Sequence, residues 1–311
     1  MALPKVEYIW MNGTLVPWDE AHVHVLTHAL HYGSGAFEGI RCYKTAEGPA
    51  IFRLPEHMAR LKDSAKMLYM DLDYTVEELC QIVIDTVKAN NLDECYIRPL
   101  AYRGYGAMGL DPIAAPLEFI VAAWPWPSFL GEDALANGVD VGVSSWRQRS
   151  INALPPAIKA VGNYLNSSFA RMEANRHGYN EAIMLNEAGH VAEGTGENLF
   201  IVRKTATGPT ITTPPVSDGI LDGITRETIL ALARDRGYAT AETSLVRTDL
   251  YTADEFFMTG TAAEIVPVRT CDNIKIGIGT VGPITRELQE AYFALVRGED
   301  PTYEHWLTRV V

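Results

Sequence analysis

The stretch PPAIKAVGNYLN, residues 155–166, places a single lysine among small and apolar neighbours. Ile158 and Ala160 flank Lys159 directly, and two prolines precede this run. Apolar surroundings disfavour the charged ammonium form of a lysine, and a neutral amine is a nucleophile. Most lysines in such a segment are simply exposed to solvent. The motifs on either side therefore decide which interpretation of Lys159 is favoured.

Three motifs on the carboxyl-terminal side of Lys159 are rich in small residues. EGTGEN, residues 193–198, carries two carboxylates and an amide on a loop with two glycines. GITR, residues 223–226, is expected to open a helix, whose first N–H groups and a threonine hydroxyl suit a phosphate. TGTAA, residues 259–263, predicts a turn that surrounds an anion with N–H groups. Together with Lys159 they supply an amine, a carboxylate and two anion sites, the set that pyridoxal phosphate requires.

On the amino-terminal side, YGSGAFEG at residues 32–39 interleaves three glycines with two aromatic residues. Such a stretch can hold the backbone close to a ligand beneath an aromatic wall. By itself it equally fits a tight hairpin. The preceding segment contains four histidines whose spacing matches no zinc motif, so structural, half-buried histidines are favoured and no metal site is predicted. These are His22, His24, His28 and His31.

A second glycine motif, GIGTVG at residues 277–282, matches the GxGxxG pattern of dinucleotide sites. Such a site needs a following strand–helix unit and an acidic residue about twenty positions on. Only one helix and a short tail are expected after residue 282. The motif is therefore predicted to be a glycine-rich turn.

The composition narrows the class of protein. The 311 residues are 47% hydrophobic and 21% charged, as in ordinary globular enzymes, and the formal net charge of −13 argues against nucleic acid or an anionic membrane as partner. The four cysteines have no CxxC spacing, and the amino terminus lacks a signal-peptide pattern. The longest apolar run, residues 119–126, is too short to span a bilayer. We expect a cytoplasmic, soluble protein.

Periodicity predicts an α+β fold of two domains. A small α+β domain is expected over residues 1–125, an interdomain linker over 126–137, and a large α+β domain carrying Lys159 over 138–311. Thr75 and Glu78 form a capping box that opens a helix. The predicted strands are 8–10, 14–17, 39–43, 50–52, 94–103, 118–124, 139–146, 181–185 and 198–202, and further helices are predicted from about residue 55 and over 164–177, 225–236 and 284–296.

Seven strings resemble the branched-chain aminotransferase members of the fold-type IV pyridoxal-phosphate enzymes. They run in the family's order from residue 28 to residue 265, so the resemblance covers nearly the whole chain and is highly specific. It implies the two-domain fold shared with D-amino acid aminotransferases. The strings are HALHYGSGAFEGIR, FRLPEHMARLKDSA, YIRPL, AIKAVGNYLNS, EGTGENLF, GITRETI and MTGTAAEI.

The resemblance implies roles in holding the cofactor, pyridoxal 5′-phosphate. Lys159 is similar to the lysine that binds it as a Schiff base and carries the proton, and Glu193 to the carboxylate that pairs with the pyridine nitrogen. Tyr164 would bind the ring hydroxyl, and Leu221 would lie against the ring face. Arg60, the backbone of Ile224 and Thr225, and Thr261 would hold the phosphate. The further cofactor-binding positions are Glu197, Asn198, Gly223 and Gly260.

The resemblance also implies a substrate site. Tyr96 and the N–H groups of Thr261 and Ala262 would bind the α-carboxylate, and Arg98 would bind the second carboxylate of glutamate. The side-chain pocket would be formed by Tyr32, Phe37, Gly39, Met108 and Trp126. In the family the tyrosine that matches Tyr32 comes from a neighbouring subunit. This implies a homodimer or a larger homo-oligomer such as a hexamer.

The function implied is transfer of an amino group from L-valine, L-leucine or L-isoleucine to 2-oxoglutarate by a ping-pong mechanism. Partners are therefore small-molecule amino acids and 2-oxo acids, with no nucleic acid and no membrane. The family often has a tyrosine where this chain has Phe129, which leaves the preference for the amino acceptor open.

The alternatives are a D-amino acid aminotransferase, an R-amine transaminase, an aminodeoxychorismate lyase or a non-enzymatic ligand-binding protein. The first carries an R-x-H pair where this chain has Met108-Gly109-Leu110, and the second lacks the Tyr96 and Arg98 pair. The lyase needs a pocket for a large cyclic acid. A binding protein has no evident use for a buried reactive lysine.

Overall fold

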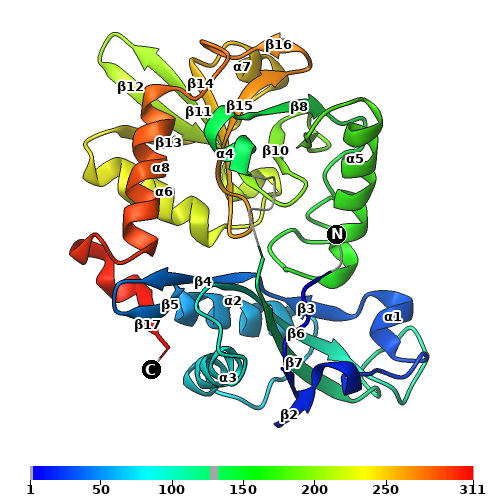
Figure 1. Cartoon of the computed structure of the whole chain (residues 1–311). Coiled ribbons are helices and arrows are strands. Elements are labelled where there is room, and N and C mark those ends of the chain that lie inside the picture. Colours follow the sequence, from blue (N-terminus) through cyan, green and yellow to red (C-terminus); the bar gives the residue numbers. More distant parts are fainter. Residues whose placement is uncertain (1–2, 127–131, 311) are drawn as a thin grey trace. The chain divides into compact units, whose positions relative to one another are not determined.

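The computed structural model describes residues 3–126 and 132–310, and these form two compact units. Unit 1 consists of Met1–Pro127, Ile158–Gly162 and Ala294–Val311. Unit 2 consists of Ser128–Ala157 and Asn163–Phe293. Each unit has its own sheet, as Figure 1 shows.

These units differ from the predicted domains in two places. Ala160 forms an antiparallel bridge with Ala36, so Lys159 belongs to unit 1, whereas the predicted bounds placed it in the carboxyl-terminal domain. The tail also joins unit 1, because strand β17 (Leu307–Arg309) pairs with β5 (Gly48–Phe52). Of the predicted linker, residues 127–131 lie outside the described part of the chain, and Phe129 with them.

The sheet of unit 1 has eight strands in the order β17-β5-β4-β6-β7-β1-β2, with β3 also paired to β6. Every pairing in it is antiparallel. The remaining elements are β1 (Tyr8–Met11), β2 (Thr14–Pro17), η1 (Trp18–Glu20), α1 (His28–Tyr32), β3 (Gly35–Phe37), β4 (Ile40–Thr45), α2 (Leu54–Met67), α3 (Val76–Ala89), β6 (Cys95–Arg103), β7 (Leu117–Trp124) and η4 (Pro301–Trp306).

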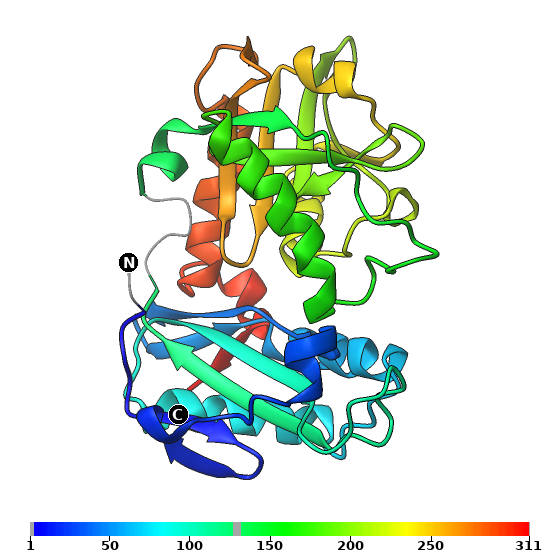
Figure 2. The same cartoon turned by 90° about the vertical axis from the view of Figure 1, so that its right-hand side faces the viewer.

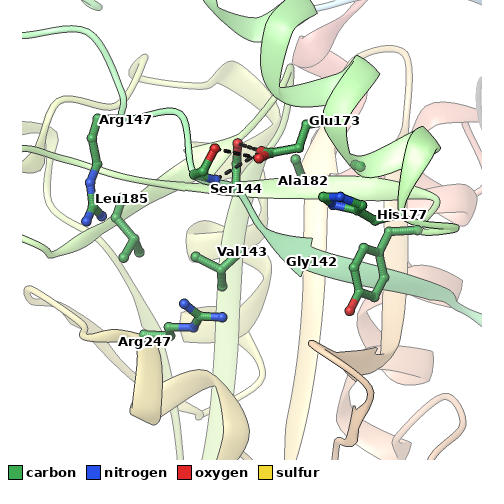
Figure 3. A pocket seen from close by; sticks show the side chains of 12 residues that line it. Gly142, Val143, Ser144, Arg147, Glu173, His177, Ala182, Leu185 and Arg247 are labelled. Atoms are coloured by element: carbon green, nitrogen blue, oxygen red, sulfur yellow. Dashed lines mark hydrogen bonds between the residues drawn. The ribbon is translucent and has the colours of Figure 1, made fainter.

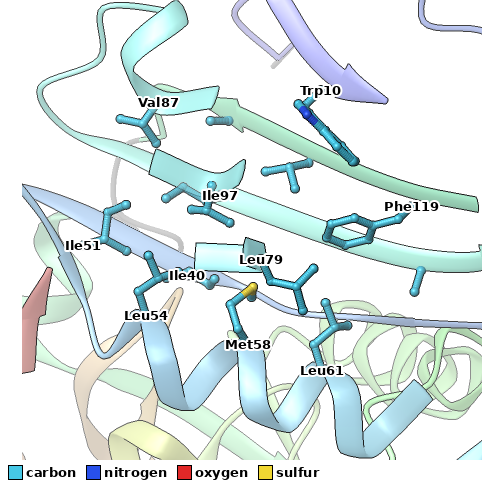
Figure 4. Close-up of a cluster of buried hydrophobic side chains, with 14 of the residues drawn as sticks. Trp10, Ile40, Ile51, Leu54, Met58, Leu61, Leu79, Val87, Ile97 and Phe119 are labelled. Carbon is cyan, nitrogen blue, oxygen red and sulfur yellow. The ribbon is translucent and has the colours of Figure 1, made fainter. Parts of the chain in front are cut away.

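The core of unit 1 lies between one face of this sheet and helices α2 and α3. Helix α2 contributes an apolar stripe that includes Leu54, Met58 and Leu61, each fully buried, against side chains such as Ile97 and Phe119 from the strands (Figure 4). Helix α3 begins at the predicted capping box, in which Thr75 accepts a hydrogen bond from the Glu78 N–H and the Glu78 side chain accepts one from the Thr75 N–H.

Strands β3 and β4 lie end to end against β6 in a single register. Phe37 pairs with Leu100 and Ile40 with Ile97, and between them the Glu38 N–H donates to the Pro99 carbonyl. Pro99 has no N–H and cannot donate a hydrogen bond back to Glu38, so the pairing of the strands is interrupted at this point. The hairpin that residues 32–39 also fitted is therefore not formed.

Alternation along these strands separates two kinds of side chain. Ala36, Ile40, Cys95, Ile97 and Ala123 lie in the core. Because successive strand residues point to opposite faces, Phe37, Tyr96, Arg98 and Trp124 lie on the other face of the sheet.

The sheet of unit 2 has nine strands in the order β10-β9-β8-β15-β14-β11-β12-β13, with β16 paired to β15. Helix α5 packs on β9 (Figure 2), and α6 packs on β13 and β14. The elements between residues 132 and 296 are α4 (Glu132–Asn137), β8 (Val139–Val143), η2 (Val161–Asn163), α5 (Tyr164–Arg176), β9 (Glu181–Leu185), β10 (Val191–Gly194), β11 (Asn198–Thr205), β12 (Gly208–Thr213), η3 (Val216–Asp218), α6 (Ile224–Asp235), β13 (Ala239–Glu242), α7 (Arg247–Tyr251), β14 (Glu255–Gly260), β15 (Glu264–Cys271), β16 (Ile274–Lys275) and α8 (Pro283–Val296).

Most predicted elements are confirmed, with shifted ends. The helices predicted over 164–177, 225–236 and 284–296 are α5, α6 and α8, each within one residue at either end. The predicted strand over 139–146 ends at Val143, and the hydroxyl of the next residue, Ser144, donates to the Glu173 carboxylate. GIGTVG is a turn, as predicted: a Cβ at Gly277 would lie 1.9 Å from the Asp254 carbonyl oxygen.

The histidine prediction is only partly right. His28 is buried, and its ring contacts the Ser34 hydroxyl at 2.7 Å and the Gly109 carbonyl at 2.8 Å. His22, His24 and His31 are exposed, since their segment lies along the surface of unit 1. In the described ranges, 3–126 and 132–310, no helix is long and apolar enough to cross a membrane.

Candidate functional site

Lys159 is anchored through its backbone. Its N–H donates to the Ser64 hydroxyl of α2 at 3.2 Å, and its carbonyl accepts the Phe37 N–H at 3.1 Å. Its Nζ lies 5.1 Å from the centre of the Phe37 ring. The flanking Ile158 and Ala160 are buried, whereas Lys159 is half-buried. The sheet and α2 therefore fix the position of this lysine, and its side chain lies beside an aromatic wall.

An arginine lies among aromatic rings on the same face of the sheet. The Arg98 guanidinium carbon is 4.6 Å from the Phe37 ring centre and 5.3 Å from the Tyr96 ring centre, and its Nη2 donates to the Tyr96 hydroxyl at 3.1 Å. Trp126 meets Tyr96 edge to face, with ring centres 4.5 Å apart. In the described part of the chain no carboxylate pairs with Arg98, and its buried Nε has no acceptor. The result is an aromatic wall around a guanidinium that has no carboxylate partner among the described residues.

The other predicted substrate residues of unit 1 fall into two places. Gly39 belongs to this cluster, because a Cβ there would lie 2.0 Å from the Tyr96 hydroxyl, so only glycine leaves room for that ring. Tyr32 and Met108 form a separate contact, in which the Tyr32 hydroxyl donates to the Met108 carbonyl at 3.4 Å. Both side chains are exposed, Tyr32 at 47% and Met108 at 38%.

Arg60 projects from α2 and is held by a buried carboxylate that the sequence analysis did not single out. Its Nε and Nη2 donate to the two oxygens of Glu38 at 2.7 and 2.8 Å. His57 donates to the same carboxylate from Nδ1 at 2.7 Å. Glu38 and His57 each lie in a segment that carries the family resemblance, but the pattern of neither segment indicates that the two side chains are in contact.

In unit 2, Glu193 is the centre of a buried hydrogen-bond network. The residue is 8% exposed, and its carboxylate accepts from Gln148 Nε2 at 2.5 Å, the Leu221 N–H at 2.9 Å and Asn198 Nδ2 at 3.3 Å. Asn198 Nδ2 also donates to the Leu221 carbonyl at 2.9 Å, and Arg149 Nη2 lies 3.9 Å from Glu193. Three predicted cofactor residues thus meet, and donors from both sides hold a carboxylate in a set direction.

Gln148 and Arg149 are members of this network that the sequence analysis missed. They come from the segment between β8 and α5, about 45 positions before Glu193. No local signal marks them, since only the fold brings that segment to β10.

Glu197 and Gly260 lie together at the end of β14. Glu197 is buried, its carboxylate accepts the Gly196 N–H at 3.0 Å, and burial raises its pKa although Gly196 and Arg171 oppose this. A Cβ at Gly260 would lie 3.3 Å from the Gly196 carbonyl oxygen. These two residues shape the EGTGEN loop around Glu193.

Helix α6 begins where the sequence analysis placed an anion site. Gly223 is its N-cap and supplies no side chain, and a Cβ there would lie 1.9 Å from Asn198 Oδ1. Ile224 and Thr225, the first two helical residues, are buried. The helix start therefore lies directly beside the Glu193 network, where its N–H groups favour an anion.

Three further predicted residues lie at two other places in unit 2. Thr261 and Ala262 form the turn between β14 and β15, after the pair Gly260 and Glu264. Tyr164 is half-buried and is the first residue of α5. Both placements agree with the turn and the helix that the sequence predicted there.

A pocket of about 270 Å³ in unit 2 contains none of the predicted residues. It is lined by residues of β8, β9 and α5, of the segments that follow β8 and α5, and by Arg247. Figure 3 shows Glu173 at its edge, hydrogen-bonded to Ser144. Ser144 and Ser145 donate to that carboxylate, so both of its oxygens already accept hydrogen bonds. It is not the candidate site.

The family model of class IV amino-transferases matches residues 35–271. The chain is 47% identical over 311 residues to the branched-chain-amino-acid aminotransferase of Escherichia coli K12, covering 100% of this chain and 99% of that protein.

Two solved proteins are similar over their full length. The crystal structure of the E. coli branched-chain amino acid aminotransferase has a TM-score of 0.95 at 46% identity and covers 99% of this chain and 100% of that one. The branched-chain amino acid aminotransferase of Thermobaculum terrenum, solved in its pyridoxal-phosphate form, has a TM-score of 0.91 at 39% identity and covers 98% of this chain and 99% of that one.

Proposed function

Because the chain belongs to the class IV amino-transferase family, we propose that it is a branched-chain amino acid aminotransferase that uses pyridoxal 5′-phosphate bound to Lys159. It transfers the amino group of L-valine, L-leucine or L-isoleucine to 2-oxoglutarate by a ping-pong mechanism. The observation that carries this proposal is Arg98, a guanidinium without a carboxylate partner in the described residues, set among Phe37 and Tyr96. One pocket can then accept an aliphatic side chain at one stage and a carboxylate at the other.

Several of the proposed cofactor residues have the chemistry that pyridoxal phosphate needs. Glu193 is a buried carboxylate whose donors fix its direction, which suits pairing with a protonated pyridine nitrogen. The start of α6, where Gly223 leaves no room for a side chain, suits the phosphate, together with Arg60, Gly260 and Thr261. The cofactor, when bound, withdraws electrons from the substrate Cα.

The protein's own residues do the remaining work. Lys159 Nζ holds the cofactor and then moves the proton at the substrate Cα, because it is anchored beside Phe37 through backbone bonds. Tyr164 would hold the ring hydroxyl, and Leu221 would lie on the ring face. Tyr96 and the N–H groups of Thr261 and Ala262 would bind the α-carboxylate of the substrate.

We further propose that the enzyme acts in the cytoplasm as a homodimer or larger homo-oligomer. Tyr32 lies on α1, whose surface also exposes Leu30 at 63% and, in the preceding segment, Val25 at 75%. Met108 and Leu110, at 86% exposed, lie in the loop that Tyr32 and His28 contact. A subunit contact at this surface would bury these apolar side chains.

The substrate range is tested by supplying the purified protein with pyridoxal phosphate and 2-oxoglutarate and offering three amino donors. We expect glutamate to form from L-valine and far less from D-alanine or an R-amine, measured by chromatography of the products. Transfer from D-alanine or the R-amine at the higher rate would instead identify one of the other transaminases of this fold. No transfer from any donor would contradict the proposed function.

Arg98→Ala should separate the two half-reactions. Removing the guanidinium takes a charged partner from the second carboxylate of 2-oxoglutarate, and a hydrogen bond to a charged group is worth about 1.5–3 kcal/mol, so kcat/KM for that half-reaction should fall roughly ten- to a hundredfold. Leucine has no such carboxylate and is the internal control. Single-turnover absorbance of the cofactor measures each half-reaction, and equal losses in both would mean that Arg98 does not distinguish the substrates.

A further inference from the structure

The Glu38 carboxylate, which the proposed mechanism does not use, is buried next to Phe37, the residue whose N–H donates to the Lys159 carbonyl. Glu38 continues the register of β3 and β4, in which Ala36, Ile40 and Cys42 face the core. It therefore occupies a core-facing position, and its exposure is 0%. A charged side chain in such a place is costly unless its charge is matched.

The match comes from one face of α2. Arg60 donates from Nε and Nη2 and His57 from Nδ1, at 2.7, 2.8 and 2.7 Å. Burial alone would raise the pKa of Glu38, but the Arg60 charge and the His57 hydrogen bond bring it well below its ordinary value. Burial lowers the pKa of His57, so a neutral imidazole with its proton on Nδ1 fits this contact. Glu38 is thus an anion held by one cation and one neutral donor.

The same helix face ties this cluster to the reacting lysine. His57, Arg60 and Ser64 follow one another at helical spacings of three and four residues, and so lie on one side of α2. Ser64 accepts the Lys159 N–H at 3.2 Å, while Phe37, next to Glu38, donates its N–H to the Lys159 carbonyl. Glu38 and Lys159 are therefore both hydrogen-bonded to residues of helix α2, which sets their positions relative to each other.

We propose that Glu38 is a positioning residue for the cofactor phosphate. Its carboxylate accepts hydrogen bonds from Nε and Nη2 of Arg60 and so fixes the direction in which the guanidinium meets that phosphate. The inference rests on the proposed function, in which Arg60 holds the phosphate. An arginine side chain has several rotatable bonds, and ordering them costs affinity when a ligand binds. Two hydrogen bonds to a buried carboxylate, made by Nε and Nη2, order the Arg60 side chain before the ligand binds and leave Nη1 directed away from Glu38.

A role through charge and a role in positioning Arg60 predict opposite changes in cofactor affinity when Glu38 is replaced by glutamine. If Glu38 acted only through its charge, its removal would relieve repulsion of a phosphate dianion, and the cofactor would bind more tightly. If Glu38 positions Arg60, the NH2 group of the glutamine amide faces an Arg60 donor and one of the two hydrogen bonds is lost. Arg60 is then less well oriented, and the cofactor binds more weakly. The sign of the change therefore decides between the two.

The experiment titrates the apoenzyme with pyridoxal phosphate and with pyridoxal, which has the same aldehyde but no phosphate, and follows the cofactor absorbance. Glu38→Gln should weaken binding of pyridoxal phosphate roughly ten- to a hundredfold, the loss of a charged hydrogen-bond pair, and leave pyridoxal within about twofold. Glu56→Gln is the matched control: this residue is on α2, pairs with Arg53 at 2.7 Å and is 37% exposed. It should change neither ligand.

Two further variants keep the test decisive. Glu38→Asp keeps the charge but is one methylene too short to hold Arg60 at both edges, so a smaller, phosphate-specific loss is expected. Adding Glu38→Gln to Arg60→Ala should cost nothing more, because the residue it positions is gone. Thermal unfolding of each apoprotein checks the fold, and if Glu38→Gln does not fold, Glu38→Asp alone decides.

Tighter or unchanged binding of pyridoxal phosphate, or equal losses for both ligands, would overturn the positioning role while leaving the proposed function intact. Failure of the unaltered protein to bind pyridoxal phosphate would overturn both.

Discussion

Lys159→Ala is expected to lower kcat/KM for amino transfer by at least about 10⁴-fold, the upper range for loss of a positioned proton-transfer group, and to abolish covalent attachment of the cofactor. The side chain is the predicted site of attachment and the predicted proton carrier, so both contributions are lost together. In the unaltered protein, borohydride should fix the cofactor to the peptide that contains Lys159. Activity is measured by glutamate formation and attachment by mass spectrometry of the digest.

The fold should survive this change, because the anchors of residue 159 are its backbone N–H and carbonyl, bonded to Ser64 and Phe37. Lys204→Ala, an exposed lysine of β11, is the control and should remain fully active. Cofactor fixed to any other lysine, or an active Lys159→Ala variant with an unchanged unfolding temperature, would refute the assignment.

Glu193→Gln is expected to lower kcat/KM by about 10²- to 10³-fold in both half-reactions, the range for removal of one preorganised electrostatic contact. The amide has no negative charge to hold a proton at the pyridine nitrogen, and both half-reactions draw on that charge. The amide nitrogen would also face Gln148 Nε2 or the Leu221 N–H, which are donors already. Single-turnover absorbance with valine and with 2-oxoglutarate measures the two losses.

Glu187→Gln is the matched control, since Glu187 is exposed in the turn between β9 and β10 and should tolerate the change. A loss confined to one half-reaction would argue against a role at the pyridine nitrogen. It would point instead to a contact with one of the substrates.

The local pattern of the sequence predicted what depends on neighbouring residues. Helices α2 and α3 follow from apolar periodicity, and α3 also from its capping box, because caps and helix faces are set by residues within a few positions. The glycine turn at 277–282 follows from the same short-range chemistry. The site residues were named through the family resemblance, which composition and periodicity could not have replaced.

Only the tertiary structure decided which of these segments meet. Unit 1 takes in Lys159 and the tail because of pairings with Ala36 and with β5, far away in sequence. Gln148 reaches Glu193 across 45 positions, and Glu38 reaches Arg60 across 22. Such contacts leave no local trace, because a buried ion pair or hydrogen bond depends on where distant backbone segments lie. The sequence by itself determined the helices, the turns and the reactive groups, whereas strand register and the packing of α2 determined which partners hold those groups.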